Sequence, residues 1–187
     1  MSYTRSMTAL FIVIVIQTII VIALLVFIYI IALYALPWKR EIPYVPTSPH
    51  VVETMRELSG NVSGKRMCDL GCGDGRILIA FANRGAESHG YEFNPLLVLI
   101  ARIRTRRARL QNRVFVHRKN FWREDLSSYD IMTIFGMPSR MDDISQLLQT
   151  RAKPGVLVLA HKFPIPGWQP LREMNGVYLY HCPPLFK

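Results

Sequence analysis

The sequence has almost no charge over a long segment near its amino terminus. Between Ala9 and Leu36 the only ionisable side chains are two tyrosines, and the clearly polar ones are Gln17 and Thr18. A helix of this length rises about 42 Å, more than the hydrocarbon core of a bilayer, about 30 Å, requires. The segment lacks the polar face of a core helix, and it is far longer than the apolar run of a cleaved signal peptide. We therefore predict a transmembrane helix over residues 9–36, after a short tail, 1–8.

Cysteine is also scarce. The three cysteines, Cys68, Cys72 and Cys182, are odd in number and unevenly spaced. They fit neither a disulfide framework nor a zinc-binding pattern, so the sequence predicts reduced thiols and no metal site.

Basic residues are distributed unevenly about the apolar segment. Lys39, Arg40 and Arg56 follow it, whereas Arg5 stands alone before it. By the positive-inside rule, the carboxyl-terminal domain should face the cytoplasm. Residues 1–8 lack the arginine- and serine-rich character of a mitochondrial transit peptide. This favours a prokaryotic plasma membrane, with the mitochondrial inner membrane as the alternative.

Four prolines between positions 37 and 49 predict a stiff connector before a single domain over residues 50–187. Apolar runs and helical periodicity alternate along that domain. The expected strands are 65–71, 88–94, 113–120, 129–136 and 156–163, and the expected helices are 50–60, 76–85, 95–111 and 141–152. Such alternation predicts an α/β fold, a Rossmann-like doubly wound sheet that is mostly parallel. Asn175-Gly176 adds the signal for an antiparallel hairpin at the carboxyl-terminal side.

The loop after the first expected strand reads D-x-G-x-G-x-G. Its glycines are Gly71, Gly73 and Gly75. A dinucleotide fingerprint, G-x-G-x-x-G, would need a glycine at position 76, where this chain has Arg76. Asp69 and Asp74 suit a cationic ligand group such as an amino-acid ammonium. The loop therefore favours S-adenosylmethionine as the cofactor over a dinucleotide.

Two further positions should complete the cofactor site at the carboxyl ends of the strands. Glu92 follows the second strand, where a carboxylate can accept hydrogen bonds from both ribose hydroxyls. Asn120 and Phe121 follow the third strand, where an amide can bind the adenine edge and an aromatic ring can cover its face.

Six short segments carry a family resemblance: YVPT (44–47), DLGCGDGRI (69–77), GYEFNP (90–95), FW (121–122), IFGMP (134–138) and FPIPGW (163–168). Together they resemble class I S-adenosylmethionine-dependent methyltransferases. The chain is most similar to the membrane-anchored protein-lysine methyltransferases that modify the adenine nucleotide translocase and the c-type subunit of ATP synthase. The resemblance implies that Asp69 and the three glycines bind the methionine part of the cofactor, Glu92 the ribose and Asn120 the adenine. The family more often has Asp at position 120 and Ser at position 72.

The acceptor should lie beside the segment FGMP. Phe135 and Met137 can wall the methyl path, and Pro138 can fix the turn. Tyr44 and Thr47 in the connector can close over the same pocket. No residue is a clear general base, and the candidate, His161, is equally suited to a structural role.

Much of the net charge of +10 lies in one probable helix, which contains Arg102, Arg104, Arg106, Arg107 and Arg109. Such a run can bind nucleic acid, contact anionic lipid headgroups or form a solvated face. The apolar segment favours lipid over nucleic acid.

The sequence therefore predicts a membrane-anchored methyltransferase that modifies a lysine of a membrane or membrane-associated protein by direct in-line transfer. Its partners would be the bilayer and that protein. The alternatives are a lipid or quinone head group as acceptor, RNA as acceptor, and a sensor that binds the cofactor without catalysis.

Overall fold

The structure is a computed structural model that describes residues 2–35 and 44–184. The chain divides into two compact units, residues 1–43 and 44–187, and each is described by itself. Most of the predicted connector, residues 37–43, lies outside the described residues, as does Leu36.

The first unit is one long helix, α1 (Ser2–Ala35). Its segment Leu10–Ala32 is long and apolar enough to cross a membrane by length and composition. The hydroxyl of Thr18 donates a hydrogen bond to the carbonyl of Ile14, 2.9 Å away, so this polar group is satisfied within the helix. The helix begins at Ser2, seven residues before the predicted boundary.

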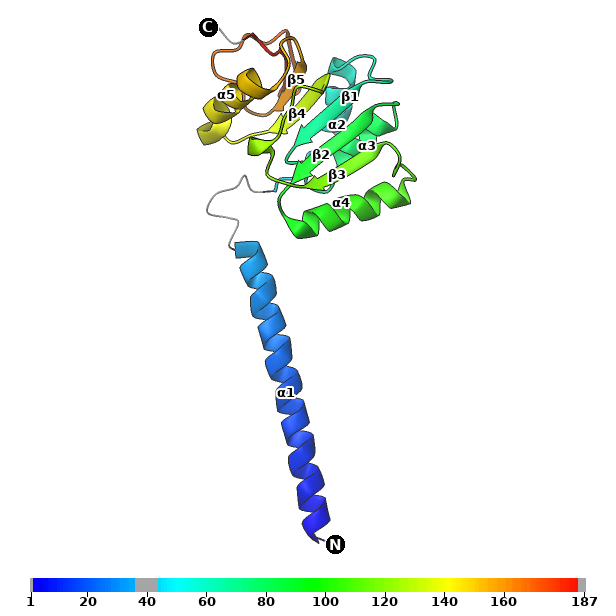
Figure 1. The fold of residues 1–187 in the computed structure, drawn as a ribbon, viewed down its shortest axis with the longest axis vertical. Helices are drawn as coiled ribbons and strands as arrows, with labels where there is room; N and C mark the ends of the chain where they lie inside the picture. The colour runs from blue at the N-terminus through cyan, green and yellow to red at the C-terminus, as the bar shows by residue number, and fades with distance from the viewer. Residues whose placement is uncertain (1, 36–43, 185–187) are drawn as a thin grey trace. The chain divides into compact units, whose positions relative to one another are not determined.

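The second unit contains a seven-stranded sheet in the order β3-β2-β1-β4-β5-β7-β6 (Figure 1). The strands are β1 (Arg66–Leu70), β2 (Glu87–Glu92), β3 (Val114–Arg118), β4 (Ile131–Phe135), β5 (Leu157–His161), β6 (Arg172–Met174) and β7 (Val177–His181). The first five strands pair in parallel, whereas β7 pairs antiparallel with β5 and β6. The strand order reverses between β1 and β4, which is the point where open α/β sheets place their ligands. The predicted doubly wound, mostly parallel sheet is confirmed.

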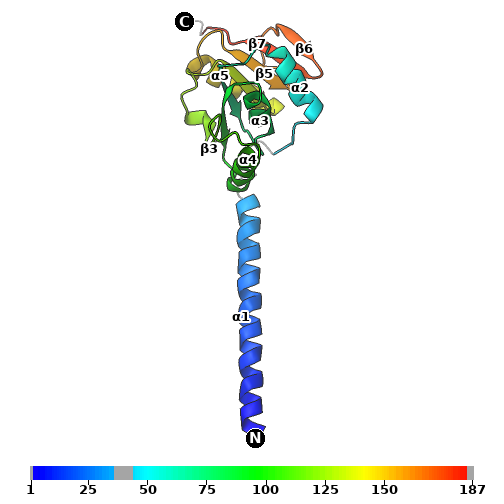
Figure 2. The same cartoon turned by 90° about the vertical axis from the view of Figure 1, so that its right-hand side faces the viewer.

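The main helices of this unit are α2 (Pro49–Leu58), α3 (Arg76–Ala82), α4 (Pro95–Arg107) and α5 (Met141–Arg151). Two apolar cores separate the faces of the sheet. In one core α2 and α3 pack on the sheet, and in the other α5 packs on β4 and β5 (Figure 2). The buried side chains of α4 are Val98, Ala101 and Thr105, and this helix packs mainly against β3. The domain helix α2 begins at Pro49, the last residue of the predicted connector.

The predicted hairpin is present. Asn175 and Gly176, with φ of 51° and 72°, form the two-residue turn between β6 and β7. Both positive φ values fit the primed turns that match the twist of a hairpin. The amide of Asn175 also donates to the hydroxyl of Thr54, 3.0 Å away, which ties the hairpin to α2.

Candidate active site

The glycine loop, residues 71–75, joins the end of β1 to the start of α3. Gly71, Gly73 and Gly75 all have positive φ, which side chains other than glycine adopt at a cost. The amides of Gly71 and Cys72 both donate to the carbonyl of Tyr91, at 2.9 and 3.0 Å, so the loop is fixed against β2. A Cβ at Gly75 would lie 3.0 Å from that of Ala101, because α4 passes close to the loop there.

Tyr44 lies over the middle of the loop. A Cβ at Gly73 would stand 2.6 Å from Cε2 of the Tyr44 ring, so the absence of a side chain admits this ring. The ring is still 45 % exposed. Burial raises the pKa of Tyr44, and the neighbouring Asp74 raises it further. Tyr44 thus borders the cofactor loop, whereas the sequence assigned it to the acceptor pocket, and that assignment stays a prediction.

Arg76 connects three parts of the site. Its guanidinium donates to the carboxylate of Asp74 over distances of 2.6 to 3.2 Å and to the carbonyl of Thr47 at 2.7 Å. Arg104, from α4, forms a second ion pair with Asp74. Burial alone would raise the pKa of Asp74, but the hydrogen bonds from Arg76 and Tyr44 outweigh it and lower that pKa. The negative charge of Asp74 is therefore balanced within the protein, and its predicted role toward a cationic ligand stays a prediction.

Asp69 is the buried carboxylate of the loop. It is 3 % exposed, and its Oδ1 accepts a hydrogen bond from the hydroxyl of Thr133 on β4 at 2.7 Å. Burial raises its pKa to about 7, the charges of Glu92 and Asp74 raise it too, and the Thr133 hydrogen bond opposes them. Sequence reasoning missed Thr133, although this residue lies opposite Asp69 in the parallel register of β1 and β4.

Glu92 ends β2 and is held by two backbone amides. Its Oε2 accepts from the amide of Gly73 at 3.0 Å, and its Oε1 accepts from the amide of Asn94 at 2.8 Å. Asn94 in turn caps α4, since its side chain accepts from the amides of Leu96 and Leu97. The carboxylate is thus oriented between the glycine loop and the start of α4, and each oxygen keeps a lone pair for a ribose hydroxyl.

Asn120 and Phe121 lie after β3, as predicted. The side-chain oxygen of Asn120 accepts from the amide of Trp122 at 3.1 Å and caps the short helix η2 (Phe121–Arg123). Asn120 is exposed, and the ring of Phe121 lies 4.9 Å from that of Trp122. Because its oxygen serves as a cap, Asn120 would offer its amide nitrogen to an adenine edge.

An aromatic group lines the carboxyl ends of β4 and β5. The ring of Phe135 lies 5.2 Å from that of His161 and 6.2 Å from that of Phe163. Nδ1 of His161 is buried and has no hydrogen-bond partner among the described residues. Burial lowers the pKa of His161, and the adjacent Lys162 lowers it further. Phe163 was not predicted, although it stands two residues after His161 in the sequence.

The remaining predicted acceptor residues lie at the ends of neighbouring elements. Met137 precedes the short helix η3 (Pro138–Arg140), which leads into α5. Thr47 is buried, and the contact recorded for it with the site is the one between its carbonyl and Arg76. The structure therefore brings Asp69, Glu92 and the glycines into direct contact, and it places Phe135 and His161 on adjacent strands.

The reversal of strand order, the glycine loop and the antiparallel β7 define a methyltransferase-like α/β domain. A solved structure titled as an RNA methyltransferase from Salinibacter ruber in complex with S-adenosyl-L-homocysteine superposes with a TM-score of 0.72 at 31% identity. It covers 76% of this chain and 97% of that one.

The model of the ANTKMT methyltransferase domain matches residues 69–172, and the chain belongs to that family. The adenine nucleotide translocase lysine N-methyltransferase of Mus musculus is 38% identical over 72% of this chain and 59% of its own length. The Xenopus laevis lysine N-methyltransferase named for the c-type subunit of ATP synthase is 35% identical over 71% of this chain and 58% of its own length. This chain thus spans about three fifths of these two relatives. A protein-lysine N-methyltransferase of Saccharolobus islandicus is 32% identical over 75% of this chain and 93% of its own length.

Proposed function

We propose that this protein is an S-adenosylmethionine-dependent methyltransferase that modifies a lysine of a membrane or membrane-associated protein. The observation that carries the proposal is the carboxylate of Glu92, fixed beside the glycine loop at the strand-order reversal. Three relatives that are named as protein-lysine methyltransferases share this domain. Two of them are named for acceptors that are membrane proteins, which supports the same class of acceptor here.

The residues of the site fit this cofactor. Asp69 offers a buried carboxylate to an ammonium group, Glu92 offers oriented lone pairs to the ribose, and Asn120 with Phe121 offers an amide and a ring to the adenine. Gly71 and Gly73 allow a close approach of the backbone. When bound, S-adenosylmethionine would supply an activated methyl group on a sulfonium.

The acceptor amine has to arrive neutral, because an ammonium has no lone pair. An unperturbed lysine has a pKa of about 10.4, and an apolar pocket lowers it by disfavouring the charged form. Phe135 and Phe163 supply the apolar surface for this desolvation. His161, held neutral by burial, can accept a hydrogen bond from the entering amine through Nδ1 and so align it. We treat it as a positioning residue.

Helix α1 supplies the anchor in this proposal. Basic residues after the apolar segment favour a cytoplasmic domain, in a prokaryotic plasma membrane by preference and in the mitochondrial inner membrane as the alternative. Retention of the full chain in membranes after alkaline extraction tests the anchor, and release into the supernatant would contradict it. Protection of the domain from added protease in sealed cells tests the orientation.

RNA is the second candidate acceptor. It is favoured by the RNA methyltransferase of Salinibacter ruber, which this chain resembles over nearly the whole length of that structure. A lipid or quinone head group is the third. It is supported by a ubiquinone biosynthesis O-methyltransferase of Acinetobacter baumannii, which is 27% identical over 66% of this chain.

One experiment separates these acceptors. The purified full chain is incubated with S-adenosylmethionine labelled in its methyl group and with native membranes, and protein, lipid and RNA are then separated. The proposal expects the label in protease-sensitive material, as methyl-lysine after acid hydrolysis. Label in the organic phase or in RNA would replace the lysine acceptor. Binding of S-adenosylhomocysteine without any transfer would instead indicate a sensor.

A further inference from the structure

Helix α4 carries an exposed apolar stripe. Leu96, Leu99 and Ile103 are 39 %, 53 % and 39 % exposed, and their spacing places them on one side of the helix. Phe93, just before the helix, is 47 % exposed. Single exposed apolar residues are ordinary, but four that gather on one helix and its approach form a surface that water disfavours.

The carboxyl-terminal half of the same helix is basic. Arg102, Arg106 and Arg107 are exposed, and the structure records no carboxylate partner for them among the described residues. Arg104 differs, because it pairs with Asp74 in the glycine loop. The sequence contains no acidic residue from position 95 to position 123. The outer face of α4 is therefore apolar at its start and positively charged at its end.

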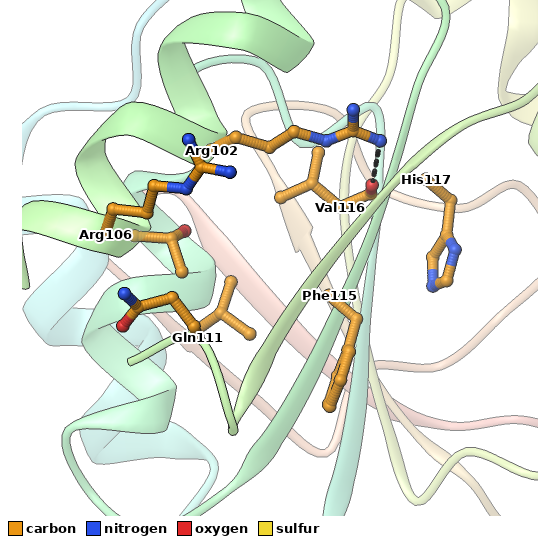
Figure 3. Close-up of a pocket in the computed structure, with 8 residues that line it drawn as sticks. Arg102, Arg106, Gln111, Phe115, Val116 and His117 are labelled. Carbon is orange, nitrogen blue, oxygen red and sulfur yellow. Dashed lines mark hydrogen bonds between the residues drawn. The ribbon is translucent and has the colours of Figure 1, made fainter. Parts of the chain in front are cut away.

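A cavity of about 270 Å³ lies between α4 and the edge strand β3 (Figure 3). Its lining includes Arg102, Arg106, Gln111 and Phe115. One guanidinium nitrogen of Arg102 donates to the carbonyl of Val116 at 3.0 Å, which fixes the side chain and leaves its other donors available. Guanidinium groups bind phosphate oxygens well, and the cavity has room for a phosphate group.

We propose that α4 is an interfacial helix that docks the domain on the bilayer surface. Leu96, Leu99 and Ile103 enter the boundary between headgroups and acyl chains, and Arg102 with Arg106 binds the phosphate of an anionic phospholipid. The inference rests on the proposed anchorage by α1. The eight residues 36–43 span at most about 30 Å, so an anchored α1 would keep the domain within reach of the surface.

The apolar stripe favours a bilayer over RNA as the occupant. Lipid surfaces bury aliphatic side chains beside basic ones, whereas nucleic acids gain little from exposed leucine and isoleucine. Docking would also bring the active site to the membrane, because the apolar end of α4 begins three residues after Glu92. A lysine close to the bilayer would then meet the site directly.

Spin labels on the full chain in lipid nanodiscs test this inference. One label is placed at Leu99→Cys, and a control label at Glu57→Cys, an exposed position of α2. The native cysteines are buried, so they should not react. In phosphatidylcholine discs that contain phosphatidylglycerol, the label at position 99 should be accessible to oxygen and shielded from a water-soluble nickel complex. The label at position 57 should stay accessible to nickel.

The arginines are tested in the same assay. At about fivefold per basic residue, the double variant Arg106→Gln/Arg107→Gln should lower the docking equilibrium constant about thirtyfold. The matched control, Lys65→Gln/Arg172→Gln, removes the same charge elsewhere and should leave docking unchanged. Equal nickel accessibility at positions 99 and 57 would overturn the inference, and so would immobilisation of the position 99 label by added RNA but not by anionic lipid. Methyl transfer and membrane retention, measured on the same samples, show separately whether the proposed function and anchor hold.

Discussion

Binding of S-adenosylhomocysteine should strengthen as the pH rises toward 7, through Asp69. Burial raises the pKa of this carboxyl to about 7, and Glu92 and Asp74 are the charged groups that raise it further. A bound ammonium would favour the ionised form, so binding below that pKa would release a proton. Affinity therefore increases with pH below 7 and levels off above it.

The size of the effect follows from the ionised fraction of Asp69. If only the ionised form binds, a pKa of about 7 gives an increase of about fifteenfold between about pH 5.5 and pH 7. Titration calorimetry in this range measures the affinity and, in buffers of different ionisation enthalpy, the proton release. Higher pH is avoided because the amino group of the ligand itself titrates at about 7.7–8.0.

Two variants make this prediction specific. Asp69→Asn should bind weakly at all pH values with no slope, and Thr133→Val should move the slope to higher pH because a hydrogen bond that favours the ionised form is lost. His161 is unchanged in both variants, so it cannot account for the difference. A slope that persists in Asp69→Asn, or a flat profile in the wild type, would refute the reasoning.

Three further changes test the rest of the site. Glu92→Gln should weaken binding of S-adenosylhomocysteine by about tenfold or more, because charge-assisted hydrogen bonds become neutral, whereas Glu87→Gln at the other end of β2 should not; calorimetry compares them. Gly73→Ala and Gly155→Ala should each lose about 1 kcal/mol of stability in thermal unfolding, since both positions have positive φ. Only Gly73→Ala should also lose cofactor affinity, because only there would the new Cβ displace an aromatic ring. Arg76→Gln should loosen the segment 44–48, seen as faster amide hydrogen exchange there, and unchanged exchange would contradict the role of this arginine.

The sequence predicted the order and type of the strands and main helices because their signals are local. Alternation of apolar runs with helical periodicity set the layers, and Asn175-Gly176 set the hairpin. The element boundaries shifted by a few residues. α4, for example, ends at Arg107 although the predicted helix continued to 111, because Arg109 has a positive φ of 58°.

The sequence could not predict contacts between distant segments. It placed Glu92 beside the loop because both follow parallel strands, and this was confirmed at 3.0 Å from the amide of Gly73. It treated Asp74 as a ligand group, since nothing local shows that Arg104, thirty residues later, reaches its carboxylate. Thr133 was missed for the same reason, because a threonine in a buried strand has no signal until the register is known.

The hydrogen bond from Arg76 to the carbonyl of Thr47 makes residues 44–48 part of the cofactor loop, although the sequence assigns them to the connector. A water-soluble version of the enzyme, made by removing the apolar helix, therefore has to begin before Tyr44. Shortening the chain to the first residue of α2 would remove the ring over Gly73 and leave the Arg76 guanidinium without its backbone acceptor. Such a shortened chain could keep its sheet and still fail to bind S-adenosylmethionine.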